Sequence, residues 1–425
     1  MKYKIITLGC KVNTYESNVI DDLLKNNGFT KTEDKADIVI INTCTVTNTA
    51  NNKSLKMIRS AIRNNEGAII IVCGCTSQVY KEDVLKIDGV SIIIGNVGKS
   101  KIIDYINEYQ KNKKQIVDVK NNDNLLFETM KLDNFDKTRA FVKIEDGCRN
   151  FCSYCIIPYT RGNVRSRDKE SILSEINELI KNGHKEIVLT GIHTGNYGSD
   201  LENYDFASLL NDLVEIEGLE RLRISSIEIT ELNDRVLDVL KKSSILVSHL
   251  HIPLQSGSDK ILKLMNRKYN KKYFEEKINQ IRSIRPDISI TTDVIVGFPG
   301  ETENDFDEMI DFITKINFSK LHVFPYSKRE GTPAATMESQ VDDVTKKNRA
   351  HSLINLSKKL EINYMEEFLN KEVSFIPEVI DNNYVVGHTG NYLLIKSYGK
   401  KEDLGKEKKV IIEKISYPYC IGKEI

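Results

Sequence analysis

The sequence has no excess charge of either sign and no long apolar run. Its 61 acidic residues balance 61 basic ones. A net charge of zero excludes attraction of the whole surface to nucleic acid, so any RNA contact must come from local patches. No apolar run approaches the length that spans a bilayer, and the N-terminus MKYKIITLGC lacks a secretory pattern. We therefore expect a cytoplasmic protein without a membrane partner, whose 8 cysteines serve metal binding or catalysis rather than disulfides.

The most informative stretch is 144–161, IEDGCRNFCSYCIIPYTR, which contains three closely spaced cysteines. Cys148, Cys152 and Cys155 form a C-x3-C-x2-C pattern, named here the central cysteine array. Thiolates are the usual ligands of iron–sulfur clusters, and three of them leave one iron of a cubane cluster open. A structural zinc site is the alternative, but it needs four ligands, and the nearest histidine in sequence is His184.

Three further cysteines recur at corresponding positions in the N-terminal region. Apolar runs alternate there with helical patterns, which predicts a parallel sheet covered by helices. The expected strands are 3–8, 37–42, 68–72 and 91–94. Cys10, Cys44 and Cys75, named here the N-terminal cysteine set, each follow one of the first three strands. Ligands gather at such strand ends, so we predict a second cluster. Ordinary buried cysteines are the alternative, and we interpret Cys73 as one.

The central region alternates strands and helices again. Strands are expected at 140–145, 186–190, 221–225, 249–254, 289–296 and 320–325, and a helix follows at 344–369. Six parallel strands predict a partial (α/β)6 barrel, similar to a TIM barrel, whose active site lies at the strand carboxyl ends. Candidate ligand contacts lie at or after the later strands: Gly191, Ser226, Glu228, Gln255, Asp293, Gly297 and Pro299.

Several cations and the C-terminal tail are candidates for RNA contact. Arg161 and Arg165 belong to a local basic run beside the central cysteine array, and Arg329 follows the last barrel strand. We expect these arginines to contact phosphate or a substrate carboxylate, although a solvated face is the alternative. The tail alternates short apolar runs with turn residues, which predicts a small antiparallel β-barrel. Tyr392 and Lys396 are its candidate RNA contacts.

These motifs resemble those of known enzymes. The central cysteine array resembles the signature of the radical S-adenosylmethionine (SAM) superfamily, in which SAM chelates the open iron, and VIVGFPGET (294–302) resembles its adenine-packing motif. The segments GCKVNTYES, NTCTVT and CGCTSQ resemble the methylthiotransferase family, and GHTGNYLLIKSYG resembles the RNA-binding TRAM domain. The resemblance covers almost the whole chain and implies three domains and a linker, at 1–110, 111–137 (the linker), 138–365 and 366–425.

The resemblance also implies an activity, cofactors and partners. It implies two [4Fe-4S] clusters, held by the two cysteine sets, and SAM bound at the central cysteine array. TLGCKVNTYES and DGCRNFCSYCIIPYTRGNVRSR look most like the branch that methylthiolates threonylcarbamoyladenosine beside the tRNA anticodon. The expected partners are the tRNA anticodon loop and a low-potential electron donor such as flavodoxin or ferredoxin. Alternatives are isopentenyladenosine tRNA, a ribosomal-protein aspartate, or a non-catalytic iron–sulfur RNA-binding protein.

Overall fold

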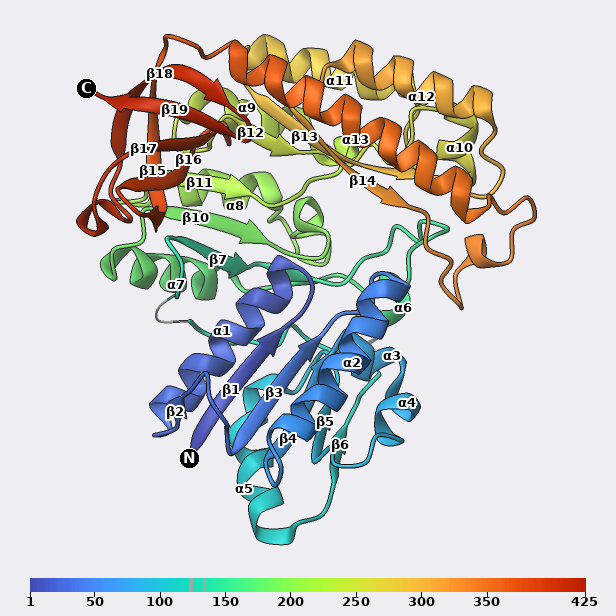
Figure 1. Ribbon diagram of the computed structural model, residues 1–425, viewed down its shortest axis with the longest axis vertical. Coiled ribbons are helices and arrows are strands. Elements are labelled where there is room, and N and C mark those ends of the chain that lie inside the picture. The colour runs from blue at the N-terminus through green and yellow to red at the C-terminus, as the bar shows by residue number, and fades with distance from the viewer. Residues whose placement is uncertain (122–124, 133–134) are drawn as a thin grey trace.

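The N-terminal unit is a parallel sheet with helices on both faces. A computed structural model describes residues 1–121, 125–132 and 135–425 (Figure 1). The strands are β1 Lys2–Thr7, β2 Thr30–Lys31, β3 Ile38–Thr43, β4 Ile69–Gly74, β5 Ile92–Ile94 and β6 Ile116–Asp118. The helices are α1 Lys11–Asn26, α2 Asn48–Asn64, α3 Cys75–Val79, α4 Lys81–Leu85 and α5 Ile102–Asn112. The strand order β2-β1-β3-β4-β5-β6 is parallel throughout.

The apolar runs of β3 and β4 are continuous because both faces of this sheet are covered. Ile38 and Ile40 pack with α1 and α5 on one face, whereas Val39 and Ile41 pack with α2 and α4 on the other. The sheet also extends beyond the expected boundary at residue 110. β6 pairs with β5 although it lies in the stretch 111–137, which we predicted to be a linker. Residues 122–124 and 133–134 of that stretch lie outside the described residues.

The central unit contains the six expected parallel strands. They are β7 Arg139–Lys143, β10 Glu186–Thr190, β11 Arg221–Ile224, β12 His249–His251, β13 Ser289–Val296 and β14 Lys320–Pro325. They form two sheets, β11-β10-β7 and β12-β13-β14, and a bridge between Leu222 and Leu246 lies between the two. A short antiparallel pair, β8 Glu145–Asp146 and β9 Arg165–Ser166, flanks the central cysteine array. This arrangement confirms the predicted partial barrel.

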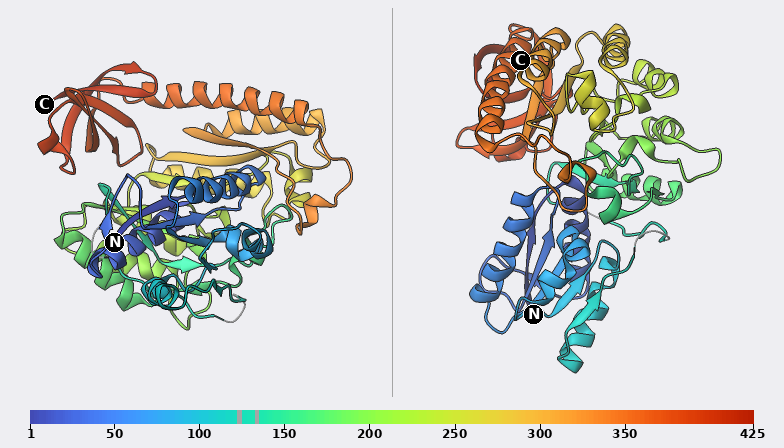
Figure 2. Two further views of the ribbon diagram at one scale, coloured as in Figure 1. Left: turned by 60° about the horizontal axis from the view of Figure 1, so that its bottom comes forward. Right: turned by 90° about the vertical axis from the view of Figure 1, so that its right-hand side faces the viewer.

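The helices of this unit cover the outside of the partial barrel (Figures 1 and 2). They are α6 Ile157–Arg161, α7 Lys169–Lys181, α8 Phe206–Val214, α9 Asp234–Lys242, α10 Asp259–Leu264, α11 Lys271–Ile284, α12 Glu303–Ile316 and α13 Asp343–Glu366. Ala140 and Val142 of β7 belong to the apolar core beneath these helices. Because side chains alternate along a strand, Arg139 and Lys143 occupy the opposite, inner face. The inner face of the barrel is therefore polar.

The C-terminal tail forms the expected small closed barrel. Its strands are β15 Glu372–Asp381, β16 Tyr384–Thr389, β17 Leu394–Tyr398, β18 Lys408–Ser416 and β19 Tyr419–Glu424. The order is β15-β16-β17-β19-β18, and the pairings are antiparallel except for the parallel pair β17–β19. Arg221 anchors the barrel to the central unit through Glu407, at 2.9 Å. None of the helices in the described ranges is long and apolar enough to cross a bilayer.

Candidate active site

The central cysteine array lies in the loop between β8 and α6, and its three side chains are half-buried. The loop is tied down by backbone contacts. The amide of Cys155 donates to the carbonyl of Cys152 at 2.9 Å, and the amide of Cys148 donates to the carbonyl of Gly162 at 3.0 Å. Phe151, between the first two cysteines, adopts a left-handed conformation with φ +46°. The loop is thus fixed by main-chain geometry.

Burial and mutual repulsion make these thiols reluctant to ionise. Burial, together with the neighbouring thiolates of Cys152 and Cys148, raises the pKa of Cys155 to about 12. Arg267 opposes this effect, because its Nη1 lies 3.2 Å from the Sγ of Cys152. An electropositive group at a set of converging thiols suits a metal-bound thiolate, in which iron replaces the proton. The residues of the central cysteine array therefore fit an iron–sulfur cluster. No motif in the sequence marks Arg267.

The N-terminal cysteine set comes together at the carboxyl ends of β1, β3 and β4, as the sheet topology predicts. The three thiols interact electrostatically with one another. Gly9 permits the close approach of two of the loops: its φ is +104°, and a Cβ there would lie 2.6 Å from the Cβ of Cys44. Cys44 and Cys75 are buried, whereas Cys10 is exposed. The set is therefore accessible from the side of Cys10.

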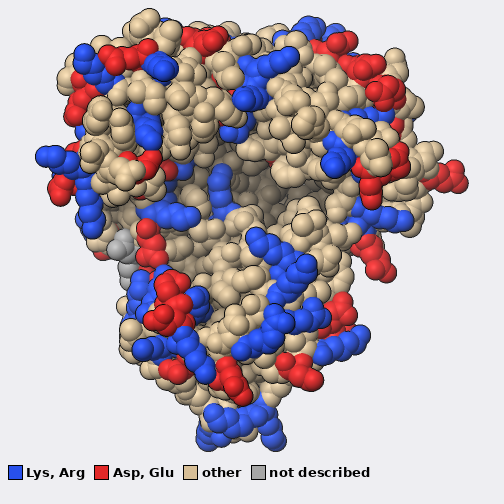
Figure 3. Space-filling model, in the orientation of Figure 1, with Lys and Arg blue, Asp and Glu red and all other residues tan. Residues whose placement is uncertain are grey.

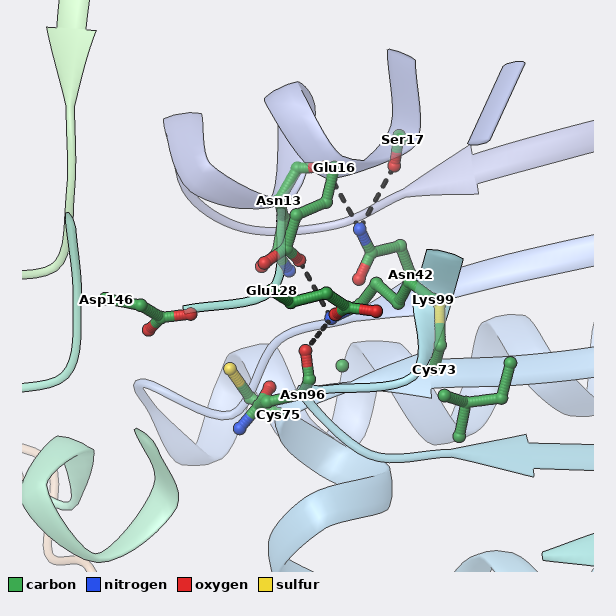
Figure 4. Close-up of polar contacts among 12 residues, drawn as sticks. Asn13, Glu16, Ser17, Asn42, Cys73, Cys75, Asn96, Lys99, Glu128 and Asp146 are labelled. Atoms are coloured by element: carbon green, nitrogen blue, oxygen red, sulfur yellow. Dashed lines mark hydrogen bonds and ion pairs between the residues drawn. The ribbon is translucent and has the colours of Figure 1, made fainter. Parts of the chain in front are cut away.

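Cys73 lies in the apolar core of the sheet, as predicted. Gly74, with φ +95°, turns the chain between Cys73 and Cys75. Figure 4 shows the two cysteines well apart, with Lys99 between them. Among the residues that the structure describes, no three His, Cys, Asp or Glu side chains are placed to hold a single metal ion. In a cubane cluster each thiolate binds a different iron, so its ligands are spread more widely than those of one ion.

Beneath the N-terminal cysteine set lies a buried group of charged residues, named here the interdomain charge network. Its members are Glu16, Lys99, Lys143, Asp146 and Arg161. Glu16 of α1 pairs with Lys99 at 3.0 Å, with Lys143 at 2.9 Å and with Arg161 at 3.2 Å. Figure 4 shows Lys99 between Glu16 and Asn96. Three cations and two carboxylates leave an excess of positive charge. An anionic cluster on the adjacent thiolates would balance it.

Arg161 joins the two cysteine sets. It ends α6, which follows the central cysteine array, and its Nη2 lies 3.5 Å from the Sγ of Cys75. The same nitrogen donates to the Oδ1 of Asn13 at 3.0 Å, and this oxygen lies 4.0 Å from the Sγ of Cys10. Each cysteine set therefore has one arginine beside a sulfur, Arg267 at the first and Arg161 at the second.

The expectation that Arg161, Arg165 and Arg329 contact RNA or a substrate carboxylate is wrong. All three side chains are buried in the protein. Arg161 is paired within the interdomain charge network, and Arg165 donates to the carbonyl of Arg161 at 2.8 Å. Arg329 donates to the Oγ1 of Thr45 at 2.6 Å, beside Cys44, and so links the last barrel loop to the N-terminal unit. Arg161 and Arg329 thus have partners that are remote in sequence, whereas Arg165 is held by nearby main-chain carbonyls.

Tyr392 is also not the exposed RNA contact that we expected. Its ring stacks on His249, with centroids 4.6 Å apart, and packs against His388 at the same separation. The guanidinium of Arg223 lies 4.8 Å from the ring centroid. The tyrosine therefore packs at the junction between the barrel and the central unit. Lys396 lies on the barrel surface, paired with Asp381 at 2.7 Å and placed over the ring of Tyr384.

The predicted ligand contacts lie at or near the carboxyl ends of β10 to β13. Gly191, Ser226, Glu228, Gln255, Gly297 and Pro299 follow these strands, and Asp293 lies within β13. Glu228 contacts Arg267, and Arg267 in turn contacts the Sγ of Cys152. A single side chain therefore separates Glu228 from the central cysteine array. Phe298, inside the adenine-packing motif, meets Tyr154 of the cysteine loop edge-on, with centroids 6.4 Å apart. These contacts bring the motif and the cysteine loop together.

Two residues of this site carried no sequence signal. Glu145 precedes the array, and its Oε2 accepts a hydrogen bond from the amide of His193 at 2.8 Å. Burial raises the pKa of Glu145 to about 8. The Nδ1 of His193 lies 3.7 Å from the Sγ of Cys148. Glycine at position 191 leaves room for the Glu145 carboxylate, because a Cβ at this position would lie 2.7 Å from the Oε2 of Glu145.

Comparison with known proteins identifies the two α/β units. Residues 142–313 match the Radical SAM superfamily, and residues 2–95 match the Uncharacterized protein family UPF0004. The radical SAM methyltransferase TsrM from Kitasatospora setae, solved with cobalamin and a [4Fe-4S] cluster, shares the fold. Its TM-score is 0.57 at 13% identity, over 79% of this chain and 76% of that chain.

Whole-chain relatives are considerably closer. The chain is 46% identical to the threonylcarbamoyladenosine tRNA methylthiotransferase MtaB of Bacillus subtilis, over 98% of this chain and 95% of the relative. It is 38% identical to the tRNA-2-methylthio-N(6)-dimethylallyladenosine synthase of Clostridium tetani, over 99% and 96%. With this identity along the whole chain and cysteine sets that fit iron–sulfur clusters, the chain belongs to the radical SAM tRNA methylthiotransferase family, enzymes that use [4Fe-4S] clusters and SAM.

Proposed function

We propose that this enzyme inserts a methylthio group at carbon 2 of N6-threonylcarbamoyladenosine, next to the anticodon of tRNA. The observation that carries the proposal is the link between the two cysteine sets. Arg161 comes from the helix that follows the central cysteine array, and it contacts Cys75 of the N-terminal cysteine set. A reaction that first activates a C–H bond and then adds sulfur to the same carbon requires two such centres side by side.

The central cysteine array would hold the cluster at which SAM binds. A cluster bound there supplies the electron that cleaves SAM to a 5′-deoxyadenosyl radical. The hydrogen on carbon 2 of adenine is aromatic and only weakly acidic, so a side-chain base cannot remove it. The protein contributes position and exclusion of water. Arg267 steadies Cys152, and the loops after β10 to β13 provide glycine backbone and polar side chains for SAM.

The N-terminal cysteine set would hold the second cluster and, with it, the sulfur to be transferred. Its accessible side is that of Cys10, which is the exposed member of the set. The opposite side is closed by the interdomain charge network, whose excess positive charge favours an anionic group on these thiols. The base would therefore approach from the Cys10 side.

The C-terminal barrel would hold the tRNA. Tyr384 and Tyr398 stack with centroids 4.5 Å apart on the barrel surface, and Tyr398 is 66% exposed. The ammonium of Lys396 lies 4.9 Å from the centroid of Tyr384. Exposed aromatic rings beside a cation are typical of RNA-binding surfaces. The anticodon loop would reach the two cysteine sets while the barrel holds the stem. A cytoplasmic low-potential donor such as flavodoxin or ferredoxin would supply electrons.

The substrate assignment can be tested directly. Reconstituted enzyme is supplied with SAM, a reductant and tRNA that carries threonylcarbamoyladenosine, isopentenyladenosine or unmodified adenosine. We expect the methylthio product, measured by mass spectrometry of nucleosides, with the first tRNA and little with the others. SAM cleavage without tRNA serves as the control for an active preparation. Equal rates with isopentenyl tRNA would favour the alternative substrate, which the relative from Clostridium tetani represents.

A further inference from the structure

Lys11 is the first residue of α1 and directly follows Cys10 of the N-terminal cysteine set. α1 packs against β7, at the junction between the N-terminal and central units (Figure 1). Figure 3 shows that this junction is hollowed and that Lys and Arg side chains lie within it. Lys11 is half-buried.

Lys11 interacts electrostatically with residues of the central unit and of the C-terminal barrel. They include Arg139 of β7, Arg223 of β11, Asp293 of β13 and Tyr392 of the barrel. Three of the four lie on strands whose inner faces point toward one another across the partial barrel. Lys11 therefore lies between the N-terminal cysteine set and the inner face of the central unit, against which α1 packs.

Within the described part of the chain, Lys11 differs from the cations of the neighbouring strands in having no counterion. Arg139 pairs with Glu378 at 3.0 Å, Arg223 with Glu186 at 2.8 Å, and Lys143 with Glu16. Among the described residues, no side-chain hydrogen bond or ion pair involves Lys11. Holding an unpaired ammonium partly away from water costs free energy. An anionic ligand would offset this cost.

The chemistry of adenine indicates which anionic group can reach Lys11. Carbon 2 and the N6 substituent both flank N1, on the edge of the base that faces away from the ribose. When carbon 2 faces the N-terminal cysteine set, an N6 substituent lies beside the same set. The phosphates of that nucleotide lie on the opposite side of the base. A carboxylate on N6 therefore fits Lys11 better than a backbone phosphate does.

We infer that Lys11 binds the carboxylate of the threonylcarbamoyl group and so determines which modified adenosine the enzyme accepts. This inference rests on the proposed function. A site that bonds a polar group discriminates strongly against an analogue that lacks it, because its own group is then left unpaired. Lys11 replaces Arg161 and Arg329 in that role, since both of those arginines are already paired within the protein.

The test measures binding of anticodon stem-loop RNAs to the cluster-loaded enzyme, with either threonylcarbamoyladenosine or unmodified adenosine at the target position. Wild type, Lys11→Met, Lys11→Arg and the control Lys111→Met are compared. Lys111 is an exposed lysine in the last turn of α5, remote from the hollow. Iron content and visible absorption show whether each variant retains its clusters, because Lys11 adjoins Cys10.

We expect wild type to bind the modified stem-loop about tenfold to a hundredfold more tightly than the unmodified one, as for a hydrogen bond to a charged group. Lys11→Met should abolish this preference and leave binding of the unmodified RNA unchanged, whereas Lys11→Arg should keep part of it. Lys111→Met should behave like wild type. A Lys11→Met variant that weakens binding of both RNAs equally would indicate a phosphate contact and overturn the inference.

Failure of the inference and failure of the proposed function give different results. If wild type methylthiolates threonylcarbamoyladenosine tRNA and Lys11→Met retains the full preference for it, only the role of Lys11 is overturned. If wild type does not methylthiolate that tRNA but does act on isopentenyl tRNA, the substrate assignment fails, and the inference about Lys11 fails with it.

Discussion

Replacing Glu16 with Gln tests the interdomain charge network most directly. The side chain is completely buried, and its carboxylate pairs with two lysines and one arginine. Burial alone would raise the pKa of Glu16, but these three cations lower it well below the ordinary value, so the group is ionised at neutral pH. Glu16→Gln keeps the shape of the side chain and removes the charge. It leaves Lys99, Lys143 and Arg161 with Asp146 as the remaining carboxylate of the network.

Removing one partner from a buried ion pair costs about 3–5 kcal/mol. Lys143 and Arg161 belong to the central unit and Glu16 to the N-terminal unit, so this loss falls on the contact between them. We expect amide hydrogen exchange in α1 and β7 to accelerate by a factor of about 10² to 10⁴ in Glu16→Gln. Iron bound by the N-terminal cysteine set should fall as well, because Arg161 would lose a partner that positions it beside Cys75.

The pH dependence and an exposed control sharpen this test. Glu16 has a lowered pKa, so its stabilisation is present above about pH 4.5 and is lost as the pH falls toward its folded pKa. The difference between wild type and Glu16→Gln should therefore shrink in acid. Glu33 pairs with Lys4 at 3.4 Å but is 87% exposed, so Glu33→Gln should change little. Exchange in α1 that accelerates less than fivefold in Glu16→Gln would refute the assigned role of the network.

The remaining predictions concern the clusters, Glu145 and the barrel. Replacing the central cysteine array with Ala should abolish SAM cleavage and leave about half of the iron bound. Replacing the N-terminal cysteine set with Ala should preserve SAM cleavage and abolish sulfur insertion. Formation of 5′-deoxyadenosine by the first variant would contradict the assignment. Burial raises the pKa of Glu145 to about 8, so the folded protein keeps a proton that the unfolded chain releases near pH 4.5. The wild-type protein therefore loses stability as the pH rises from about 4.5 to about 8. The stability advantage of Glu145→Gln should thus grow to roughly 4 kcal/mol by pH 8, measured by denaturation across pH, and a constant difference would argue against a neutral Glu145. Tyr398→Ala should weaken tRNA binding about tenfold at constant salt, and unchanged affinity would exclude stacking on the barrel.

The sequence alone determined those features that depend on short spacing and strand periodicity. The C-x3-C-x2-C pattern brings three thiols together within one loop, whatever the rest of the fold does. The alternation of apolar runs and helical patterns predicted the parallel strands of both α/β units. In the N-terminal sheet the runs are continuous, because both of its faces are covered. Cys10, Cys44 and Cys75 could be grouped for the same reason, since parallel strands end at one edge.

Only the tertiary structure decided which charges are free. The sequence shows that Arg161 is a cation near the cysteines, but its partner Glu16 lies 145 residues away, and the short-range pattern does not contain that pairing. Arg329 and Tyr392 were misjudged for the same reason: each is covered by a unit distant in the chain. By contrast, nothing in the sequence around Cys10 indicated that Lys11 would be an unpaired cation. Burial and pairing of a charge depend on what packs against it, and in this protein these contacts form between units that only the completed fold brings together.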